Sequence, residues 1–73
     1  MASEIVDVPI AGKIMSVQTS PGSSIKEGDV ICLIESMKME NPIVAPVSGV
    51  IREIRVSPEQ SVRVGDVLAV IEY

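Results

Sequence analysis

The sequence contains no histidine, no phenylalanine and no tryptophan, and only one tyrosine and one cysteine. Without histidine there is neither a Cys–His nucleophile nor a histidine-ligated metal site, and a single cysteine excludes a disulfide framework. The net charge is −4, and basic runs and aromatic stacking platforms are missing, which excludes nucleic acid as a partner. Cys32 lies in the apolar run 30–34 and is expected to be a small buried residue.

Long hydrophobic runs are also lacking. No apolar stretch approaches membrane-spanning length, and the acidic start at residues 1–8 lacks the layout of a secretion signal. We therefore expect a cytoplasmic protein without membrane insertion. Its 73 residues hold one domain, residues 1–73, whose core must come from Val, Ile, Leu and Ala, and this composition favours β-sheet.

The chain contains an internal duplication. Residues 8–35 align without a gap onto residues 45–72, an offset of 37 positions, with residues 36–44 joining the two halves. The identities fall mostly at turns and core positions: Pro9 with Pro46, Gly12 with Gly49, Ile14 with Ile51, Ser20 and Pro21 with Ser57 and Pro58, Gly28 to Val30 with Gly65 to Val67, and Ile34 and Glu35 with Ile71 and Glu72.

Each half reads as four short strands separated by turn residues. Gly28 and Gly65 each precede an aspartate and are expected to take positive φ in tight turns. Because neither half can bury its apolar face alone, the two should pack on one another. The predicted fold is all-β: a flattened eight-stranded barrel or sandwich of two four-stranded antiparallel sheets with pseudo-two-fold symmetry and no helix longer than one turn.

The joining segment begins with ESMKMEN, residues 35–41. If the preceding strand turns straight into the next, Met37 and Lys38 are the two central turn residues and Glu35 faces Glu40. Both features are locally unfavourable, because such turns prefer glycine or asparagine and like charges repel across a ladder. Broken local rules of this kind mark candidate functional sites. The symmetry places this hairpin at the pole opposite the two chain termini.

Residues 35–40 resemble the attachment motif of biotinyl domains, in which a Met-Lys-Met triplet at a hairpin tip carries biotin on the lysine. The resemblance extends over nearly the whole chain, through PIAGKI at 9–14, EGDVICLIE at 27–35 and APVSGVI at 45–51. The family's fold is the same flattened eight-stranded barrel, and the gapless repeat leaves no room for the thumb insertion of some members.

The resemblance implies a non-catalytic carrier. A biotin protein ligase would join biotin to the Nζ atom of Lys38, and the ring would carry carboxylate from a biotin carboxylase to a carboxyltransferase. Met37 and Met39 would be flanking recognition residues, and Glu35 a flanking charge. The residues themselves agree, since no nucleophile–base pair stands out among them.

Two alternatives stay open. Lipoyl domains share the fold and a modified lysine, but usually have an acidic residue before it and a small one after it, where this chain has Met37 and Met39. An unmodified structural hairpin domain needs no lysine at the tip. The other lysines, Lys13 and Lys26, are expected to be ordinary solvated residues. The start at Met1 slightly favours a free-standing protein over an excised domain.

Overall fold

A computed structural model describes all 73 residues, and its regular structure consists of eight β-strands without any helix. Two of the strands are only two residues long, whereas the others have five to seven residues. The strands are β1 (Ser3–Asp7), β2 (Gly12–Val17), β3 (Ser24–Ile25), β4 (Val30–Ser36), β5 (Met39–Val44), β6 (Gly49–Ile54), β7 (Ser61–Val62) and β8 (Val67–Glu72).

The strands form two four-stranded antiparallel sheets, in the orders β1-β8-β6-β3 and β5-β4-β2-β7. This confirms the predicted fold class. The halves do not simply stack, however, because each sheet takes two strands from each half. Four strand pairs join the halves: β1 with β8, β4 with β5, and the two-residue strands β3 and β7 with the longer β6 and β2. Strand order thus ties the two halves together through backbone hydrogen bonds as well as side-chain packing.

The two-fold repeat is visible strand by strand. Strands β2 and β6, which are related by the repeat, have the same length and the same alternation of buried and exposed residues. Gly28 and Gly65 have φ values of 90° and 94°, which confirms the positive φ predicted for both turns. A residue with a side chain is strained in that conformation, so glycine is strongly favoured at both places.

Apolar residues on the inner faces of both sheets, with three residues just outside the strands, form one core of fifteen buried residues, none of them polar or charged. Successive side chains of a strand point to opposite faces, which gives the alternation. The pairs Ile31–Cys32 and Leu68–Ala69 are buried side by side where the strand register shifts. Cys32 is fully buried among them, as predicted. The core consists of Val6, Val8, Ile14, Ile25, Ile31, Cys32, Ile34, Ile43, Ala45, Ile51, Val56, Val62, Leu68, Ala69 and Ile71.

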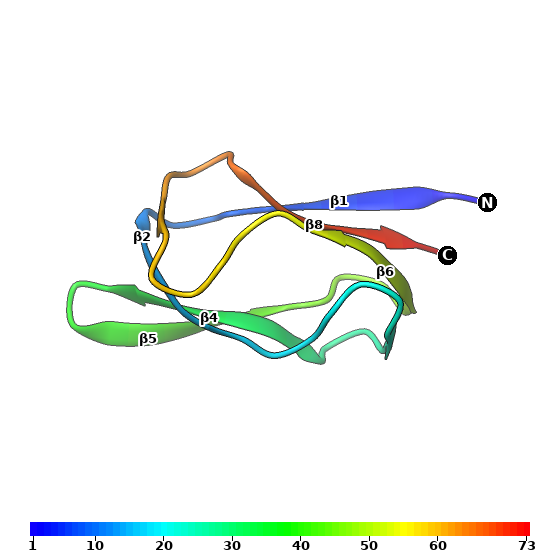
Figure 1. Cartoon of the computed structure of the whole chain (residues 1–73), viewed down its shortest axis with the longest axis horizontal. Coiled ribbons are helices and arrows are strands. Elements are labelled where there is room, and N and C mark those ends of the chain that lie inside the picture. The colour runs from blue at the N-terminus through cyan, green and yellow to red at the C-terminus, as the bar shows by residue number, and fades with distance from the viewer.

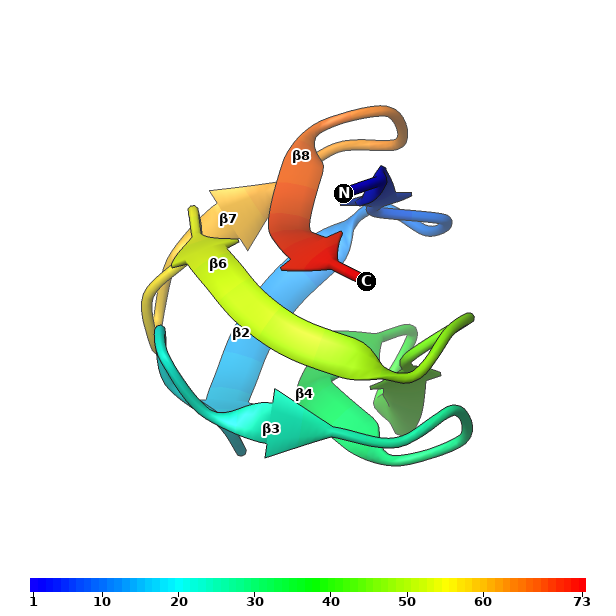
Figure 2. The same cartoon turned by 90° about the vertical axis from the view of Figure 1, so that its right-hand side faces the viewer.

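The molecule is elongated, with principal extents of 37 × 18 × 17 Å. The β4–β5 hairpin forms one pole and both termini lie at the other (Figure 1). Figure 2 looks onto the terminal pole, where the two ends of the chain lie close together. There Ala2 and Tyr73 exchange two backbone hydrogen bonds of 2.9 Å. The predicted separation of hairpin and termini is confirmed.

Candidate functional site

The β4–β5 hairpin closes through a two-residue turn made of Met37 and Lys38. Ser36 pairs with Met39 and Glu35 with Glu40, which is the register predicted from the sequence. Met37 has φ 53° and Lys38 has φ 65°, the left-handed pair that a type I′ turn requires. Each of these non-glycine residues therefore sits in a conformation that costs about 1–2 kcal/mol.

The flanking strands hold this strained turn in place. Strand β4 pairs with β5 on one side and β2 on the other, and Ile34 and Ile43 anchor the two hairpin strands in the core. The side-chain amide nitrogen of Asn41 also donates to the carbonyl oxygens of Ile34 and Met39, each at 3.3 Å. Tertiary contacts and strand pairing thus outweigh the poor local turn preference.

The side chains at the tip are open to solvent. Met37 is 90% exposed and Met39 is 66% exposed, and Lys38 between them is also exposed. None of the three ion pairs in the structure includes Lys38. The amine of Lys38 is therefore available to a reagent or to a partner protein.

Beside the hairpin, Lys13 of β2 lies opposite Glu35 and forms a 2.8 Å ion pair with Glu59. The hydrogen bond and charge of Glu59 raise the pKa of Lys13, with a smaller contribution from Glu35. In turn, the hydrogen bond and charge of Lys13 lower the pKa of Glu59. Lys13 and Lys26 are both exposed, as predicted, and Lys13 in addition forms an ion pair that the sequence did not indicate.

Glu59 also has an unusual backbone. Its φ is 75°, and the residue related to it by the repeat is Gly22, with φ 90°. Sequence reasoning missed this position, although the alignment of the halves contains its only indication: a glutamate stands where the other half has glycine, and a lysine at position 13 stands where the other half has Val50.

Gly12 fixes how closely β2 approaches β4 at the base of the hairpin. A Cβ atom added there would lie under 3.0 Å from the carbonyl oxygen of Glu35. Gly49 has the same relation to Glu72 at the terminal pole. Both glycines are therefore required by close packing of strands.

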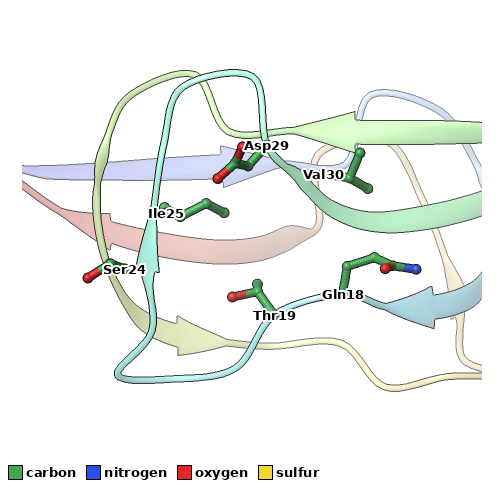
Figure 3. Close-up of a pocket in the computed structure, with 6 residues that line it drawn as sticks. All are labelled: Gln18, Thr19, Ser24, Ile25, Asp29 and Val30. Atoms are coloured by element: carbon green, nitrogen blue, oxygen red, sulfur yellow. The ribbon is translucent and has the colours of Figure 1, made fainter.

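A cavity of about 310 Å³ lies away from the tip, near the start of β4 at Val30 (Figure 3). Its lining includes Asp29, whose carboxylate already accepts a 3.0 Å hydrogen bond from the backbone N–H of Lys26. The cavity is open and lies at the opposite end of β4 from Ser36, so it does not belong to the hairpin site. The lining residues are Gln18, Thr19, Ser24, Ile25, Asp29 and Val30.

Other reactive groups are scarce. No three Cys, Asp or Glu side chains converge in a way that could hold a metal ion. Burial raises the pKa of the Cys32 thiol to about 11, which makes a thiolate nucleophile unfavourable there. The structure has no helix of the length and apolarity needed to cross a membrane. The exposed lysine at the hairpin tip is the one prominent chemical feature.

Comparison with known families matches residues 4–71 to the model of biotin and lipoyl attachment domains, described as "Biotin-requiring enzyme". The chain belongs to this family. The family assignment thus agrees with the resemblance of the tip motif and with the fold. Where biotin would be attached is a separate question, which the geometry of Lys38 addresses.

Among curated relatives of this biotinyl domain, the gamma subunit of methylmalonyl-CoA decarboxylase from Veillonella parvula is 44% identical over 43 residues. That match covers 59% of this chain and 33% of the relative, so the chain spans about a third of that protein's length. The domain also superposes on the urea carboxylase of Kluyveromyces lactis with a TM-score of 0.91 and 28% identity, covering 99% of this chain and 6% of that one.

The fold is shared more widely. The lipoyl domain of the 2-oxoglutarate dehydrogenase complex from Azotobacter vinelandii superposes with a TM-score of 0.76 and 24% identity. The superposition covers 93% of this chain and 96% of the lipoyl domain. At this identity the likeness concerns the fold alone.

Proposed function

We propose that the chain is a biotin carboxyl carrier, in which biotin is joined by an amide to the Nζ atom of Lys38. The observation that carries the proposal is the position of Lys38: an exposed, unpaired amine on a two-residue turn at the pole opposite the termini. Biotin is the matching cofactor, because the family to which the chain belongs is described as biotin-requiring.

The geometry suits a group that must visit several partners. Strand pairing fixes both sides of the turn, so little backbone freedom is left to lose when a partner binds the tip. The termini lie at the far end of a molecule 37 Å long, so attachment to a larger assembly there leaves the tip free. A rigid body with one long side arm meets the requirements of a carrier.

The chemistry is supplied by partners. Forming the amide removes a proton from the nitrogen and needs an activated acyl group, so the biotin protein ligase must provide both that group and a proton acceptor. The loaded biotin would then accept carboxylate at a biotin carboxylase and release it at a carboxyltransferase. The names of the relatives include a decarboxylase and a carboxylase, which supports carboxylate transfer as the shared theme. The domain itself is proposed to be non-catalytic, and its cytoplasmic location stays a prediction.

Mass spectrometry of the protein co-produced with a biotin protein ligase tests the proposal. One biotin is expected, on the peptide containing Lys38, together with binding to streptavidin. Lys38→Arg should remain folded, because the side chain is exposed and unpaired, and should carry no biotin. Lys13→Arg and Lys26→Arg are the matched controls and should still be labelled.

Different results identify the alternatives. A lipoyl adduct on Lys38 without biotin in protein from its native source would replace biotin by lipoate as the cargo. Complete absence of an adduct in the presence of active ligase would favour a structural hairpin domain. Persistent labelling of Lys38→Arg would place the attachment site elsewhere. Moving the lysine to position 39 by Lys38→Met with Met39→Lys should also abolish labelling, because residue 39 is the first residue of β5, paired with Ser36, and not one of the two turn residues.

A further inference from the structure

The two methionines beside Lys38 are unusual in being apolar and almost unprotected. Met37 is 90% exposed and Met39 is 66% exposed. Neither belongs to the hydrophobic core or to the residues packed against it. The protein contains four methionines in all, so half of them flank one exposed lysine. Their place at the tip contributes nothing to the packing that holds the domain together.

Exposure decides which sulfur atoms an oxidant can reach. The only thiol, Cys32, is fully buried, and burial also suppresses its reactive thiolate form. Met15 on β2 is 42% exposed, and Met1 is fully exposed at the distant terminal pole. The sulfur atoms that combine exposure with a position at the proposed attachment site are therefore those of Met37 and Met39.

We propose that Met37 and Met39 are an oxidation-sensitive modification site that controls loading of Lys38. The thioether sulfur attacks one oxygen of hydrogen peroxide, the O–O bond breaks, and sulfoxide and water are formed. Sulfur is thereby oxidised by two electrons and the peroxide is reduced. A methionine sulfoxide reductase reverses the change, with two thiols becoming a disulfide and the sulfoxide oxygen leaving as water. The effect on loading rests on the proposed carrier function, whereas the oxidation itself does not.

The position of the methionines explains why oxidation would affect loading. Each is the immediate neighbour of Lys38, so a protein surface that encloses the amine must also contact at least one of them. A thioether is flexible and apolar, and a sulfoxide is polar and chiral. The oxidised tip would present a polar group that has to lose its water on binding. The core contains neither side chain, so the fold should survive the same oxidation.

The first experiment measures the modification. The unloaded protein is treated with hydrogen peroxide, the peroxide is removed with catalase, and each methionine-containing peptide is followed by mass spectrometry. Met37 and Met39 should gain one oxygen each before Met15 does, Cys32 should remain a thiol, and the thermal midpoint should stay unchanged. Equal or faster oxidation of Met15, or unfolding that accompanies oxidation of the tip, would overturn the proposal.

The second experiment measures loading. The initial rate of biotin attachment by the ligase is compared for untreated, oxidised and reductase-treated protein. The initial rate of biotin attachment is expected to fall roughly two- to tenfold on oxidation. The free energy of a methionine contact corresponds to a change of about this size. The reductase should restore the rate. An unchanged rate in fully oxidised protein would refute the control of loading.

Variants assign the effect to the tip. The Met37→Leu and Met39→Leu double variant should show the same rate before and after peroxide, whatever its starting rate. The Met15→Leu variant should accept biotin more slowly after oxidation, as the original protein does. A peroxide effect that persists in the double variant would assign the sensitivity to another residue. If untreated protein accepts no biotin at all, the carrier function fails, and the peptide measurement still decides whether the tip methionines are oxidised before Met15.

Discussion

Replacing Gly12 or Gly49 by alanine gives a matched pair of perturbations at the two poles. A Cβ at Gly12 would lie under 3.0 Å from the carbonyl oxygen of Glu35 and 2.9 Å from Cγ2 of Ile34. At Gly49 the same contacts arise with Glu72 and with Cγ2 of its buried neighbour, again at 2.9 Å. The two changes therefore insert the same group into the same kind of gap.

The cost can be estimated from the atoms involved. The closest atom in each case is a backbone oxygen, so relief requires a strand to shift rather than a side chain to rotate. Such overpacking typically costs about 1–3 kcal/mol. A domain of 73 residues has a total stability of roughly 4–11 kcal/mol. A loss of about 2 kcal/mol would lower the thermal midpoint by roughly 8–16 °C.

The two variants should differ in loading although they lose similar stability. Gly12→Ala pushes on Glu35, at the base of the hairpin that presents Lys38, whereas Gly49→Ala pushes on Glu72 beside the termini. Circular dichroism gives the two midpoints, and ligase kinetics are measured at a temperature where both variants are folded. We expect slower biotin attachment for Gly12→Ala and an unchanged rate for Gly49→Ala.

Two results would refute this reasoning. An unchanged midpoint in Gly12→Ala would mean that β2 and β4 do not approach each other as closely as described. An equal reduction of the loading rate in both variants would show that general loss of stability, and not displacement of the hairpin, controls the reaction.

Other predictions concern the ion pair and the cysteine. Glu59→Ala should lower the thermal midpoint. The midpoint of Glu59→Gly should be roughly 4–8 °C above that of Glu59→Ala, because glycine accepts the positive φ at this position. Equal midpoints for these two variants would contradict the prediction. The lowered pKa of Glu59 means that the stability from the ion pair is present above the ordinary carboxylate pKa and is lost as pH falls through the lowered value. Because the pKa of Lys13 is raised, the same stability is lost again as pH rises through that raised pKa. The difference in thermal midpoint between the original protein and Glu59→Gln should therefore be largest near neutral pH and vanish in strong acid and in strong base. Cys32 should resist iodoacetamide in the folded protein and react in urea, and labelling of the folded protein at neutral pH would contradict its burial. Its raised pKa should reduce the stability of the fold as pH rises from 9.0 to about 11.

The sequence was sufficient for the fold class and for the register of the hairpin. The repeat fixes where strands and turns recur, and the glycines at 28 and 65 identify turns that need positive φ. The hairpin register followed from the assumption that the strand before the joining segment turns directly into the next one, and the observed pairing of Ser36 with Met39 confirms it. Periodicity and symmetry are local or repeated properties, and both can be read from the sequence.

Contacts between the halves were harder to predict. The pairing of β3 with β6 and of β2 with β7 depends on how the halves interleave, which alternating patterns do not specify. The close approach at Gly12 and the ion pair between Lys13 and Glu59 both depend on that arrangement. Residues far apart in sequence meet there, so neither contact has a local sequence pattern.

Positions at which the two halves have the same residue reflect requirements of the fold. Positions at which they differ reflect features that only the hairpin tip has. Gly12 and Gly49 are identical because the same two-strand contact occurs at both poles. Lys13 and Glu59 replace a valine and a glycine of the other half, and they meet beside the hairpin. A glutamate with φ 75° is less favourable than glycine for folding alone. The departures from symmetry at these positions therefore place an ion pair beside the hairpin that carries Lys38, and the other half has no counterpart to it.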